Sequence, residues 1–536
     1  MRRIILWPTI VCSLFLPITG VSARPVHAAE PMARLAHSTL PVLRKATYVT
    51  RAAGSRKLEI AVTLSSQNPA ALTEFLGELY DPSSPNYHQF LTPGQFAADF
   101  GPTEADYNSV KAYLTSYRLL ITQEYANHLV IDAEGSLAQV ERAFGVHINK
   151  YSIGARAFIA NDRDIQLPAS IATVVAGVSG LQDYLKLTPH LQPSPHKTQF
   201  SFRPNTPQGY SPQQIATAYD FTGAYNTGNI GTGQTIAIAT AYGFSTSDIS
   251  TFFSQFGLSV PNYSVVAVDG TPASTNIETT LDLQRSGAMA YGANIIVYEG
   301  VNANLSTFED IYNAIASNQA VSVVTTSWGL CEQEMPAANL NADHQIFMSA
   351  ASEGQAWFAA SGDSGAFDCG GRKLAVDYPS SDPYVAATGG TSLTLTSSNT
   401  ISSETAWSDS GGGVSVEFGK PSYQSGLSGS SRQTADVAFD ANPNTGYPVM
   451  YGGRWAEYGG TSFAAPQWAA VYAIAEQYNG ASLGAAAPAL YALNGNADGF
   501  HDITSGNNGH YSAVLGWDDP TGWGSPDVWG LAQLLK

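Results

Sequence analysis

The segment Gly459-Gly-Thr-Ser-Phe-Ala-Ala-Pro466 leads directly into an apolar, helix-forming run, Gln467–Gln477. Its glycines allow another chain to approach the backbone, and Ser462 stands at the amino end of the predicted helix. Free backbone N–H groups and the helix dipole favour developing negative charge at such a position. Pro466 fits the first turn, where its missing N–H costs no hydrogen bond. The segment therefore predicts a reactive serine, with a helix-capping serine as the alternative.

Short apolar runs alternate with helical stretches around this segment, and they are too apolar for strands with one wet face. They are Thr235–Thr240, Asn294–Tyr298, Val321–Ser327 and Trp357–Ser361. Such runs suit a parallel sheet covered on both faces. Because ligands bind at the carboxyl ends of the strands in these folds, the polar residues that follow them become candidates, above all Trp328 and Asp363.

A nucleophilic serine needs a group that accepts its proton. After residue 206 the chain contains only three histidines, His344, His501 and His510, and none lies in a His-Gly-Thr-His setting before Ser462. The sequence therefore predicts that something other than histidine is the base.

Two carboxylates offer an alternative base. The stretch 276–290 is typical of a helix, and it places Glu278 and Asp282 one turn apart on one face. Two such carboxyl groups can share a proton, which raises one pKa and yields a base suited to acidic conditions. The alternative is a solvated acidic face on which Arg285 pairs with Asp282.

These motifs, in this order, resemble those of the sedolisins, or serine-carboxyl peptidases, in their pro-kumamolisin-like form. The matching stretches are Glu278-x-x-x-Asp282, Ser361-Gly-Asp-Ser-Gly365 and Gly460-Thr-Ser462, and 81–93 and 96–100 look like the family's activation propeptide. The resemblance implies an α/β fold. A subtilisin-like catalytic domain, with a mainly parallel sheet covered by helices, would follow an α+β propeptide domain.

The resemblance also implies a role for each catalytic residue. Ser462 would be the nucleophile, Glu278 the general base and acid, and Asp282 the support of Glu278. Asp363 would stabilise the oxyanion in its protonated form, with a turn-capping aspartate as the alternative. Thr240 stands where some relatives carry a further glutamate, which argues against an extended proton relay.

Substrate contacts are expected at three places. Trp328 would lie beside the carboxyl pair, unless it is a core tryptophan. The run 410–415 resembles a glycine-rich wall for backbone pairing with a peptide, through Gly411, Gly412 and Gly413, with a flexible hairpin as the alternative. Asp377 is expected to line a side-chain pocket.

The C-terminal region resembles the family's calcium loop. The expected ligands of one structural Ca²⁺ ion are the carboxylates of Asp502 and Asp518 and the carbonyls of Ile503, Val514 and Gly516. This all-oxygen set suits calcium. A metal-free loop with capping aspartates is the alternative.

The N-terminus predicts export. Arg2 and Arg3 precede an apolar run and small residues that fit a signal peptide over residues 1–28, with a retained anchor as the alternative. Export makes a Cys331–Cys369 disulfide plausible, although two buried thiols would also fit. The predicted organisation is a signal peptide (1–28), a propeptide (29–188), a linker with the processing site (189–206) and a peptidase domain with the calcium loop (207–536).

The charge distribution is uneven. The chain has 43 acidic and 25 basic residues, but residues 1–205 carry a net charge of +3 and residues 206–536 carry −21. No basic stripe exists to bind nucleic acid. We expect the acidic domain to attract the propeptide, and acidification to weaken that attraction.

These features together predict a secreted, extracellular serine-carboxyl endopeptidase. It would act on proteins or peptides at acidic pH, be made as a self-processing zymogen that binds its own propeptide, and be monomeric after processing, without nucleic-acid or membrane partners. The alternatives are a tripeptidyl exopeptidase of the same fold, an inactive peptidase-like binding protein, and a glycoside hydrolase, which also uses paired carboxylates.

Overall fold

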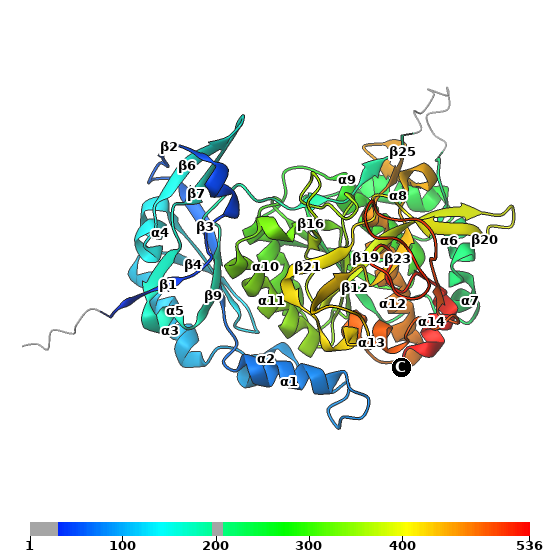
Figure 1. Cartoon of the computed structure of the whole chain (residues 1–536), viewed down its shortest axis with the longest axis horizontal. Helices are drawn as coiled ribbons and strands as arrows, with labels where there is room; N and C mark the ends of the chain where they lie inside the picture. Colours follow the sequence, from blue (N-terminus) through cyan, green and yellow to red (C-terminus); the bar gives the residue numbers. More distant parts are fainter. Residues whose placement is uncertain (1–29, 196–206) are drawn as a thin grey trace, which may run out of the picture.

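The computed structural model describes residues 30–195 and 207–536, which form two domains packed side by side (Figure 1). The N-terminal domain, in blue and cyan, ends after strand β9 (Val175–Ser179), and the C-terminal domain runs from green to red. The predicted signal peptide and residues 196–206 of the predicted linker lie outside the described residues. Within the described ranges, no helix is long and apolar enough to cross a membrane.

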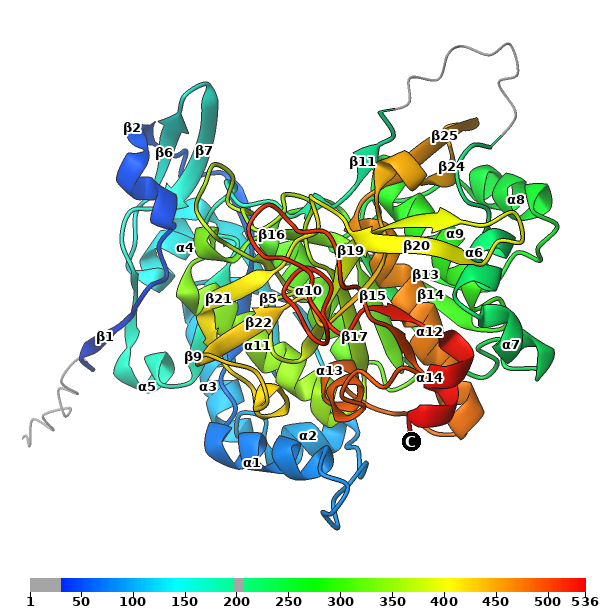
Figure 2. The same cartoon turned by 45° about the vertical axis from the view of Figure 1, so that its right-hand side comes forward.

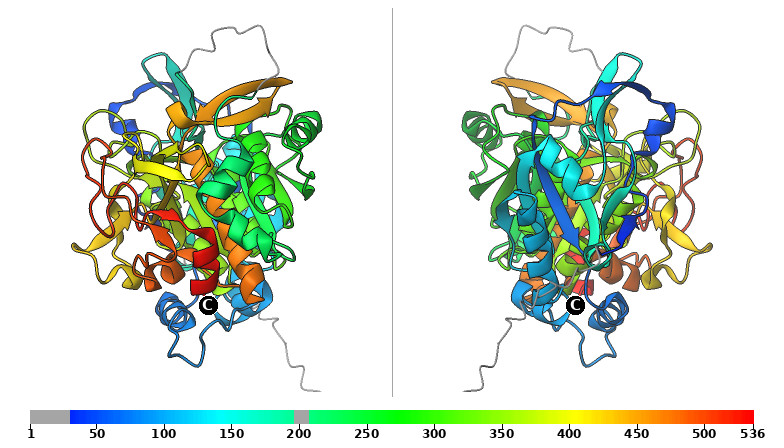
Figure 3. Two further views of the ribbon diagram at one scale, coloured as in Figure 1. Left: turned by 90° about the vertical axis from the view of Figure 1, so that its right-hand side faces the viewer. Right: turned by 90° about the vertical axis from the view of Figure 1, so that its left-hand side faces the viewer.

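The N-terminal domain faces the viewer in Figure 3 (right). It is built on a four-stranded antiparallel sheet in the order β4-β5-β3-β9. The first three strands are β4 (Leu120–Glu124), β5 (Val130–Ser136) and β3 (Lys57–Leu64). Alternate residues of β3, Leu58 to Leu64, form a core with α3 (Glu104–Ser116) and α4 (Leu137–Phe144). Because side chains along a strand alternate between the two faces of a sheet, Ala61 and Thr63 point to the face opposite this core.

That second face packs against the C-terminal domain. Ala61 joins a core shared with helices α10 (Leu305–Ala316) and α11 (Ala337–Ser352). On β9, a Cβ at Gly177 would lie 2.7 Å from the carbonyl oxygen of Ala338, so a glycine permits this close approach of strand and helix. The helices α1 (Pro69–Leu79) and α2 (Pro93–Asp99) extend the contact beneath α11 (Figure 1).

Two smaller sheets complete the N-terminal domain. One is three-stranded and joins β2 (Thr47–Arg51), β6 (Ile148–Ile153) and β7 (Arg156–Asn161); the other pairs β1 (Met32–Leu35) with β8 (Ile165–Pro168), which leads into α5 (Ala169–Ala172). The mixture of antiparallel strands and helices is the α+β arrangement that the sequence predicted.

The C-terminal domain is built on an eight-stranded sheet in the order β13-β14-β12-β15-β17-β19-β20, with β23 also pairing with β19. All pairs are parallel except β19–β20. The strands are β12 (Thr235–Ala241), β13 (Asn262–Val268), β14 (Asn294–Gly300), β15 (Val323–Thr326), β17 (Ala356–Ala360), β19 (Val385–Leu395), β20 (Ile401–Ala406) and β23 (Val437–Asp440).

Helices cover both faces of this sheet. In β12, Ile236 packs on the side of α9 (Ile277–Met289) and α12 (Ala464–Asn479), whereas Ala237 and Ala239 pack on the side of α10 and α11. This double burial explains why the central strands β12, β15 and β17 contain no charged residue, and it confirms the predicted subtilisin-like α/β class.

Further elements of the domain lie around the sheet (Figure 2). They are α6 (Pro212–Ala218), α7 (Phe221–Asn226), α8 (Thr246–Gln255), α13 (Ala486–Ala492), α14 (Val528–Leu534), β16 (Trp328–Cys331), β18 (Asp377–Tyr378), β21 (Gly413–Gly419), β22 (Ser431–Thr434), β24 (Tyr447–Tyr451), β25 (Arg454–Gly459), β26 (Phe500–His501) and β27 (Ser525–Pro526).

Candidate active site

Ser462 lies in a single 3₁₀ turn, Thr461–Phe463, that leads into α12. The side chain is fully buried in the described chain. The Ser462 backbone N–H donates a 3.0 Å hydrogen bond to the carbonyl of His190, a residue of the segment that leaves the N-terminal domain. A donor at the amino end of a helix is thus aimed at a peptide carbonyl from elsewhere in the chain.

Glu278 and Asp282 occupy the first two turns of α9. Asn276 caps this helix by accepting a 2.8 Å hydrogen bond from the N–H of Glu278. Both carboxyl groups are fully buried, as is Arg285, whose guanidinium lies 4.4 Å from the ring centroid of Tyr447. The alternative of a solvated acidic face is therefore wrong, because the helix has no solvated face at these positions.

Burial is the largest effect that raises the pKa of both carboxyl groups well above ordinary values. Repulsion by Asp282 adds to the increase at Glu278, whereas the hydroxyls of Ser462 and Ser327 oppose it. Ser327 Oγ donates a 2.7 Å hydrogen bond to Asp282 Oδ1. Two buried carboxyl groups without a cation favour a shared proton.

Asp363 follows strand β17 and faces the same carbonyl. Its Oδ1 accepts hydrogen bonds from the Thr461 N–H (2.8 Å) and hydroxyl (2.9 Å), whereas its buried Oδ2 has no hydrogen-bond partner in the described chain. Burial raises the pKa of Asp363 to about 6, against the effects of His190 and Thr461. A protonated Oδ2 is thus available as a donor.

Gly460 makes the approach of these groups possible. Its φ of 118° is in the region that favours glycine. A Cβ there would collide with the His190 carbonyl oxygen and lie 2.5 Å from Asp363 Oδ2. This lack of a side chain lets the carbonyl reach both Ser462 N–H and the neighbourhood of Asp363.

The segment around His190 runs through the site as an extended strand. Thr188–Pro189 (β10) pairs antiparallel with β16, and Gln192–Pro193 (β11) pairs antiparallel with β25 (Figure 2). Between them, the His190 N–H donates a 3.1 Å hydrogen bond to the carbonyl of Ser327. The His190–Leu191 peptide is therefore held on both sides, with its carbonyl at Ser462.

The His190 side chain enters a cavity of about 760 Å³ that Asp377 and Asp368 help to line. Its Nε2 lies 3.1 Å from Oδ2 of the fully buried Asp377. A disulfide joins Cys331 to Cys369, the neighbour of Asp368, and so ties β16 to this wall. Asp377 thus lines the cavity that the His190 side chain enters.

Trp328 is buried, and its indole Nε1–H donates a 2.9 Å hydrogen bond to Thr240 Oγ1. The Thr240 hydroxyl lies 2.9 Å from that of Thr279, the neighbour of Glu278. The backbone of Trp328 pairs with Pro189 of the linker. Trp328 is therefore both a packed core residue and part of the wall along the linker.

The glycines of the predicted wall pack closely against neighbouring segments. A Cβ at Gly411 would meet the backbone of Ser361, and one at Gly413 would meet the ring of Tyr511; Gly412 packs against the backbone of Asp519. All of these contacts lie within the C-terminal domain. Close packing within the domain is the role that the structure gives them.

The predicted calcium loop brings two carboxylates together. Asp518 Oδ2 accepts from the N–H of Val514 and Asp502 Oδ2 from that of Gly516, both at 2.9 Å. Burial raises the pKa of Asp518 to about 6, and Asp502 adds to the increase by repulsion. The side chain of Ile503 is buried beside them. Within the described ranges, no group of three or more His, Cys, Asp or Glu residues has metal-binding geometry.

Sequence reasoning missed His190, Leu191, Ser327 and Thr461. The first two lie in the predicted linker, but nothing local marks them as the bond at Ser462. Thr461 is part of the Gly-Thr-Ser motif, so the motif itself could have indicated its contact with Asp363. Ser327 ends a predicted strand, the place where functional residues are expected.

Known proteins show the same combination of parts. Residues 44–184 match the pro-kumamolisin activation domain, and residues 266–524 match the subtilase family. Sedolisin of Pseudomonas sp. (strain 101) is 31% identical over 89% of this chain and 87% of its own length. Kumamolisin of Bacillus sp. (strain MN-32) is 32% identical, over 90% and 92%.

A solved structure and a further relative agree with these matches. The structure of Pseudomonas sedolisin complexed with two molecules of pseudo-iodotyrostatin superposes with a TM-score of 0.56 at 32% identity, covering 61% of this chain and 98% of that one. Tripeptidyl-peptidase 1 of Rattus norvegicus is 27% identical, over 87% of this chain and 89% of its own length.

The fold and the match define the chain as a serine-type peptidase with an activation propeptide. It belongs to the sedolisin family, the serine-carboxyl peptidases. The glycoside hydrolase alternative is therefore wrong. The N-terminal and C-terminal domains are named the propeptide and catalytic domains below.

The contact between Thr461 and Asp363 predicts a shift in pH dependence. The Thr461 hydroxyl lowers the pKa of Asp363, so Thr461→Val should raise that pKa above about 6. In its predicted role as oxyanion donor Asp363 must keep its proton, and the alkaline limb of the kcat/KM profile should therefore move to higher pH. Thr461→Ser, which keeps the hydroxyl, is the matched control, and the alkaline limb of its profile should stay at the parental pH. An alkaline limb that does not move in Thr461→Val would contradict the predicted role of Asp363.

Proposed function

We propose that the protein is a secreted, self-processing endopeptidase that acts at acidic pH. The observation that supports this best is the position of the His190 carbonyl, which accepts a hydrogen bond from the Ser462 N–H beside Asp363. The chain offers its own peptide bond where a substrate carbonyl would be attacked. The processing bond proposed is therefore His190–Leu191.

In the proposed mechanism, Ser462 Oγ attacks the carbonyl carbon of His190 while Glu278 takes its proton. The oxyanion is stabilised by the Ser462 N–H and by the protonated Oδ2 of Asp363. Glu278 then donates its proton to the amino group of Leu191 as the peptide bond breaks. Water hydrolyses the acyl-enzyme by the same proton transfers in reverse.

The need for acid follows from Asp363. An ionised Asp363 would repel the oxyanion, so the stabilising contact is complete below its pKa of about 6 and is lost as the pH rises through that value. Asp282 supports Glu278 by sharing a proton with it, and Ser327 positions Asp282 through its 2.7 Å hydrogen bond.

An endopeptidase is favoured over a tripeptidyl exopeptidase by the path of the linker. An exopeptidase of that kind requires a free amino group three residues before the bond that is cut, which here would be Thr188. The chain continues past that point: the Leu187 N–H donates a 3.0 Å hydrogen bond to the Ala303 carbonyl, and Lys186 forms a β-bridge with Asn304. The groove therefore accepts an uninterrupted chain.

Substrates would be recognised as extended peptides. The backbones of Trp328 and Gly329 pair with residues before the scissile bond, and β25 pairs with residues after it. Asp377 meets the side chain at the His190 position. An inactive peptidase-like protein is a weaker alternative, because Ser462 and all three carboxyl groups are in place.

The loop around Asp518 fits one structural Ca²⁺ ion. Its buried carboxylate repels that of Asp502, and Asp519 Oδ1 is buried without a partner among the described residues. A cation would remove this repulsion, and carbonyls of Ile503, Val514 and Gly516 would complete an oxygen ligand set. The ion would stabilise the loop and take no part in the proton transfers.

Secretion is supported by the predicted signal peptide and by the Cys331–Cys369 disulfide, since disulfides persist in oxidising compartments. A monomer after processing remains a prediction from the sequence.

Ser462→Ala should block processing of the purified chain at acidic pH. The parent should yield a fragment whose amino-terminal residue is Leu191, as determined by amino-terminal sequencing, whereas the variant should keep an intact linker. Ser403→Ala, an exposed serine on β20, is the matched control and should process normally. Full self-processing by Ser462→Ala would disprove the proposal.

A peptide with a blocked amino group distinguishes the two peptidase types. We expect the mature enzyme to cut an acetylated peptide that carries Lys-Leu-Thr-Pro-His-Leu-Gln-Pro, residues 186–193, at the His-Leu bond. Mass spectrometry of the products checks the position of the cut. Cleavage of the free peptide alone, three residues from its amino end, would instead indicate an exopeptidase.

Chelation should destabilise the protein. A site that is occupied at about 100 times its Kd contributes about 2.7 kcal/mol, so EDTA should lower the melting temperature. Asp518→Asn should also lower the melting temperature, and EDTA should then cause no further decrease. The control Asp498→Asn, at an exposed position, should keep the parental melting temperature and the parental response to EDTA. A melting temperature unchanged by EDTA in the parent would count against the calcium site.

A further inference from the structure

Within the described ranges 30–195 and 207–536, no ion pair between a Lys or Arg residue and a carboxylate joins the two domains. Every such Lys or Arg pair joins two residues of the same domain, as Lys57 with Glu134 and Lys111 with Glu124 do in the propeptide. Arg34, Arg51, Arg56, Lys57, Lys111 and Arg163 of the propeptide thus pair with carboxylates of their own domain. The predicted attraction of opposite charges is not built into this contact.

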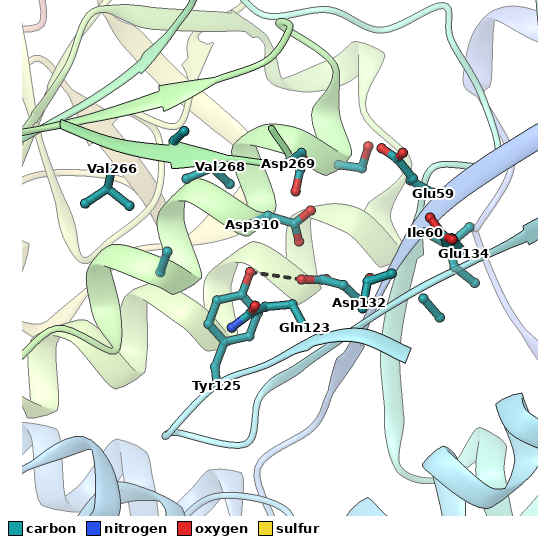
Figure 4. A pocket seen from close by; sticks show the side chains of 15 residues that line it. Glu59, Ile60, Gln123, Tyr125, Asp132, Glu134, Val266, Val268, Asp269 and Asp310 are labelled. Carbon is teal, nitrogen blue, oxygen red and sulfur yellow. Dashed lines mark hydrogen bonds between the residues drawn. The ribbon is translucent and has the colours of Figure 1, made fainter. Parts of the chain in front are cut away.

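The interface instead encloses a cavity of about 410 Å³ lined by acidic side chains from both domains (Figure 4). Glu59, Asp132 and Glu134 come from the propeptide, and Asp269 and Asp310 from the catalytic domain. Among the described residues that line it, none is Lys, Arg or His. One of the lining carboxylates, Glu134, pairs with the ammonium group of Lys57.

Asp132 of β5 faces Asp310 of α10 across this cavity (Figure 4). The Tyr125 hydroxyl donates a 2.9 Å hydrogen bond to Asp132 Oδ2. Oδ1 of each aspartate is buried without a partner in the described chain, and the two residues are 7% and 5% exposed. Only a proton on one carboxyl group turns this repulsive pair into a hydrogen-bonded one.

Glu309, the neighbour of Asp310, makes a second contact with the propeptide through a buried carboxyl group. It is fully buried and accepts hydrogen bonds from the hydroxyls of Thr63 and Ser179, both of the propeptide. Asp343 of α11 faces it from the catalytic side and is itself fully buried. No basic group offsets this pair within the described ranges.

The direction of the pH effect follows from these surroundings. Burial raises the pKa of Asp132 and of Asp269 to about 6 and that of Glu309 to about 7. The pKa of Asp310 lies well above its ordinary value because of burial and of repulsion by Asp132 and Asp269. When the domains separate, the groups regain water and their ordinary pKa values near 4. The docked state therefore binds more protons.

The geometry points to a proton-dependent binding surface: α10 holds the propeptide through carboxyl groups that share protons, so docking strengthens as the pH falls. The stabilisation of the docked state by these protons is fully present below about pH 4, and it is lost as the pH rises from there to about 7. This reverses the effect expected from net charge. Acid would then bring the linker into the site under the same conditions that protonate Asp363.

Hydrogen exchange of the uncut chain tests this proposal without any proteolysis. The Leu91 and Leu187 amides donate across the interface to the carbonyls of Ser352 (2.9 Å) and Ala303 (3.0 Å), and the Ser462→Ala variant is expected to keep both hydrogen bonds. Mass spectrometry of peptides that contain them, corrected for intrinsic exchange, should show at least about tenfold less protection at about pH 7.5 than at about pH 4.5, since one pKa unit corresponds to a factor of ten.

Asp310→Asn in the Ser462→Ala background removes one negative charge and keeps the shape of the side chain. In this variant, protection at about pH 7.5 should be lower than at about pH 4.5 by only about threefold or less. Asp132→Asn tests the same pair from the propeptide side, should Asp310→Asn fail to fold. The exposed Asp498→Asn is the control and should follow the parent. Protection in the parent that is constant or greater at the higher pH, or parental pH dependence in both cluster variants, would overturn the proposal. Because the chain is inactive throughout, a failure of the proposed peptidase mechanism would not alter the result.

Discussion

The hydrogen bond from the Ser462 N–H to the His190 carbonyl sets the requirements for the rest of the structure. It requires Gly460, because any side chain there would exclude the carbonyl. It requires the linker to be extended, which the pairing with β16 and β25 provides. It also requires the propeptide to dock on α10 and α11, because the chain must enter the groove from that side.

Buried carboxyl groups recur at both functional regions of the molecule. Glu278 and Asp282 are buried on α9, where no Lys or Arg of the described part of the chain forms an ion pair with them, and Asp132 and Asp310 face each other at the domain interface. In each pair, loss of water makes two negative charges costly, so one proton is retained. Catalysis and docking would therefore respond to acid for the same physical reason, although the two pairs lie on different helices.

Much of the fold could be predicted from sequence because local patterns carry it. The apolar strand at Thr235–Ala241 and the helix that holds Glu278 and Asp282 both appear within a few residues of their predicted bounds. The Gly-Thr-Ser motif located Ser462 for the same reason. The pairing of His190 with Ser462, and of Asp132 with Asp310, could not be predicted, since each joins residues from different domains. The glycines at 411–413 show another limit: their pattern predicted a wall for a peptide backbone, but it could not reveal their close packing against Ser361, Asp519 and Tyr511.

The continuous path of the linker has a kinetic consequence. If the His190–Leu191 bond is cut in place, the new carboxyl terminus at His190 remains paired with β16, and its domain remains docked on α10 and α11. The first turnover would thus leave the enzyme as a complex with its own product, bound at two places at once. The appearance of activity toward other proteins would then be governed by the departure of this product rather than by the cleavage itself, and would show a lag.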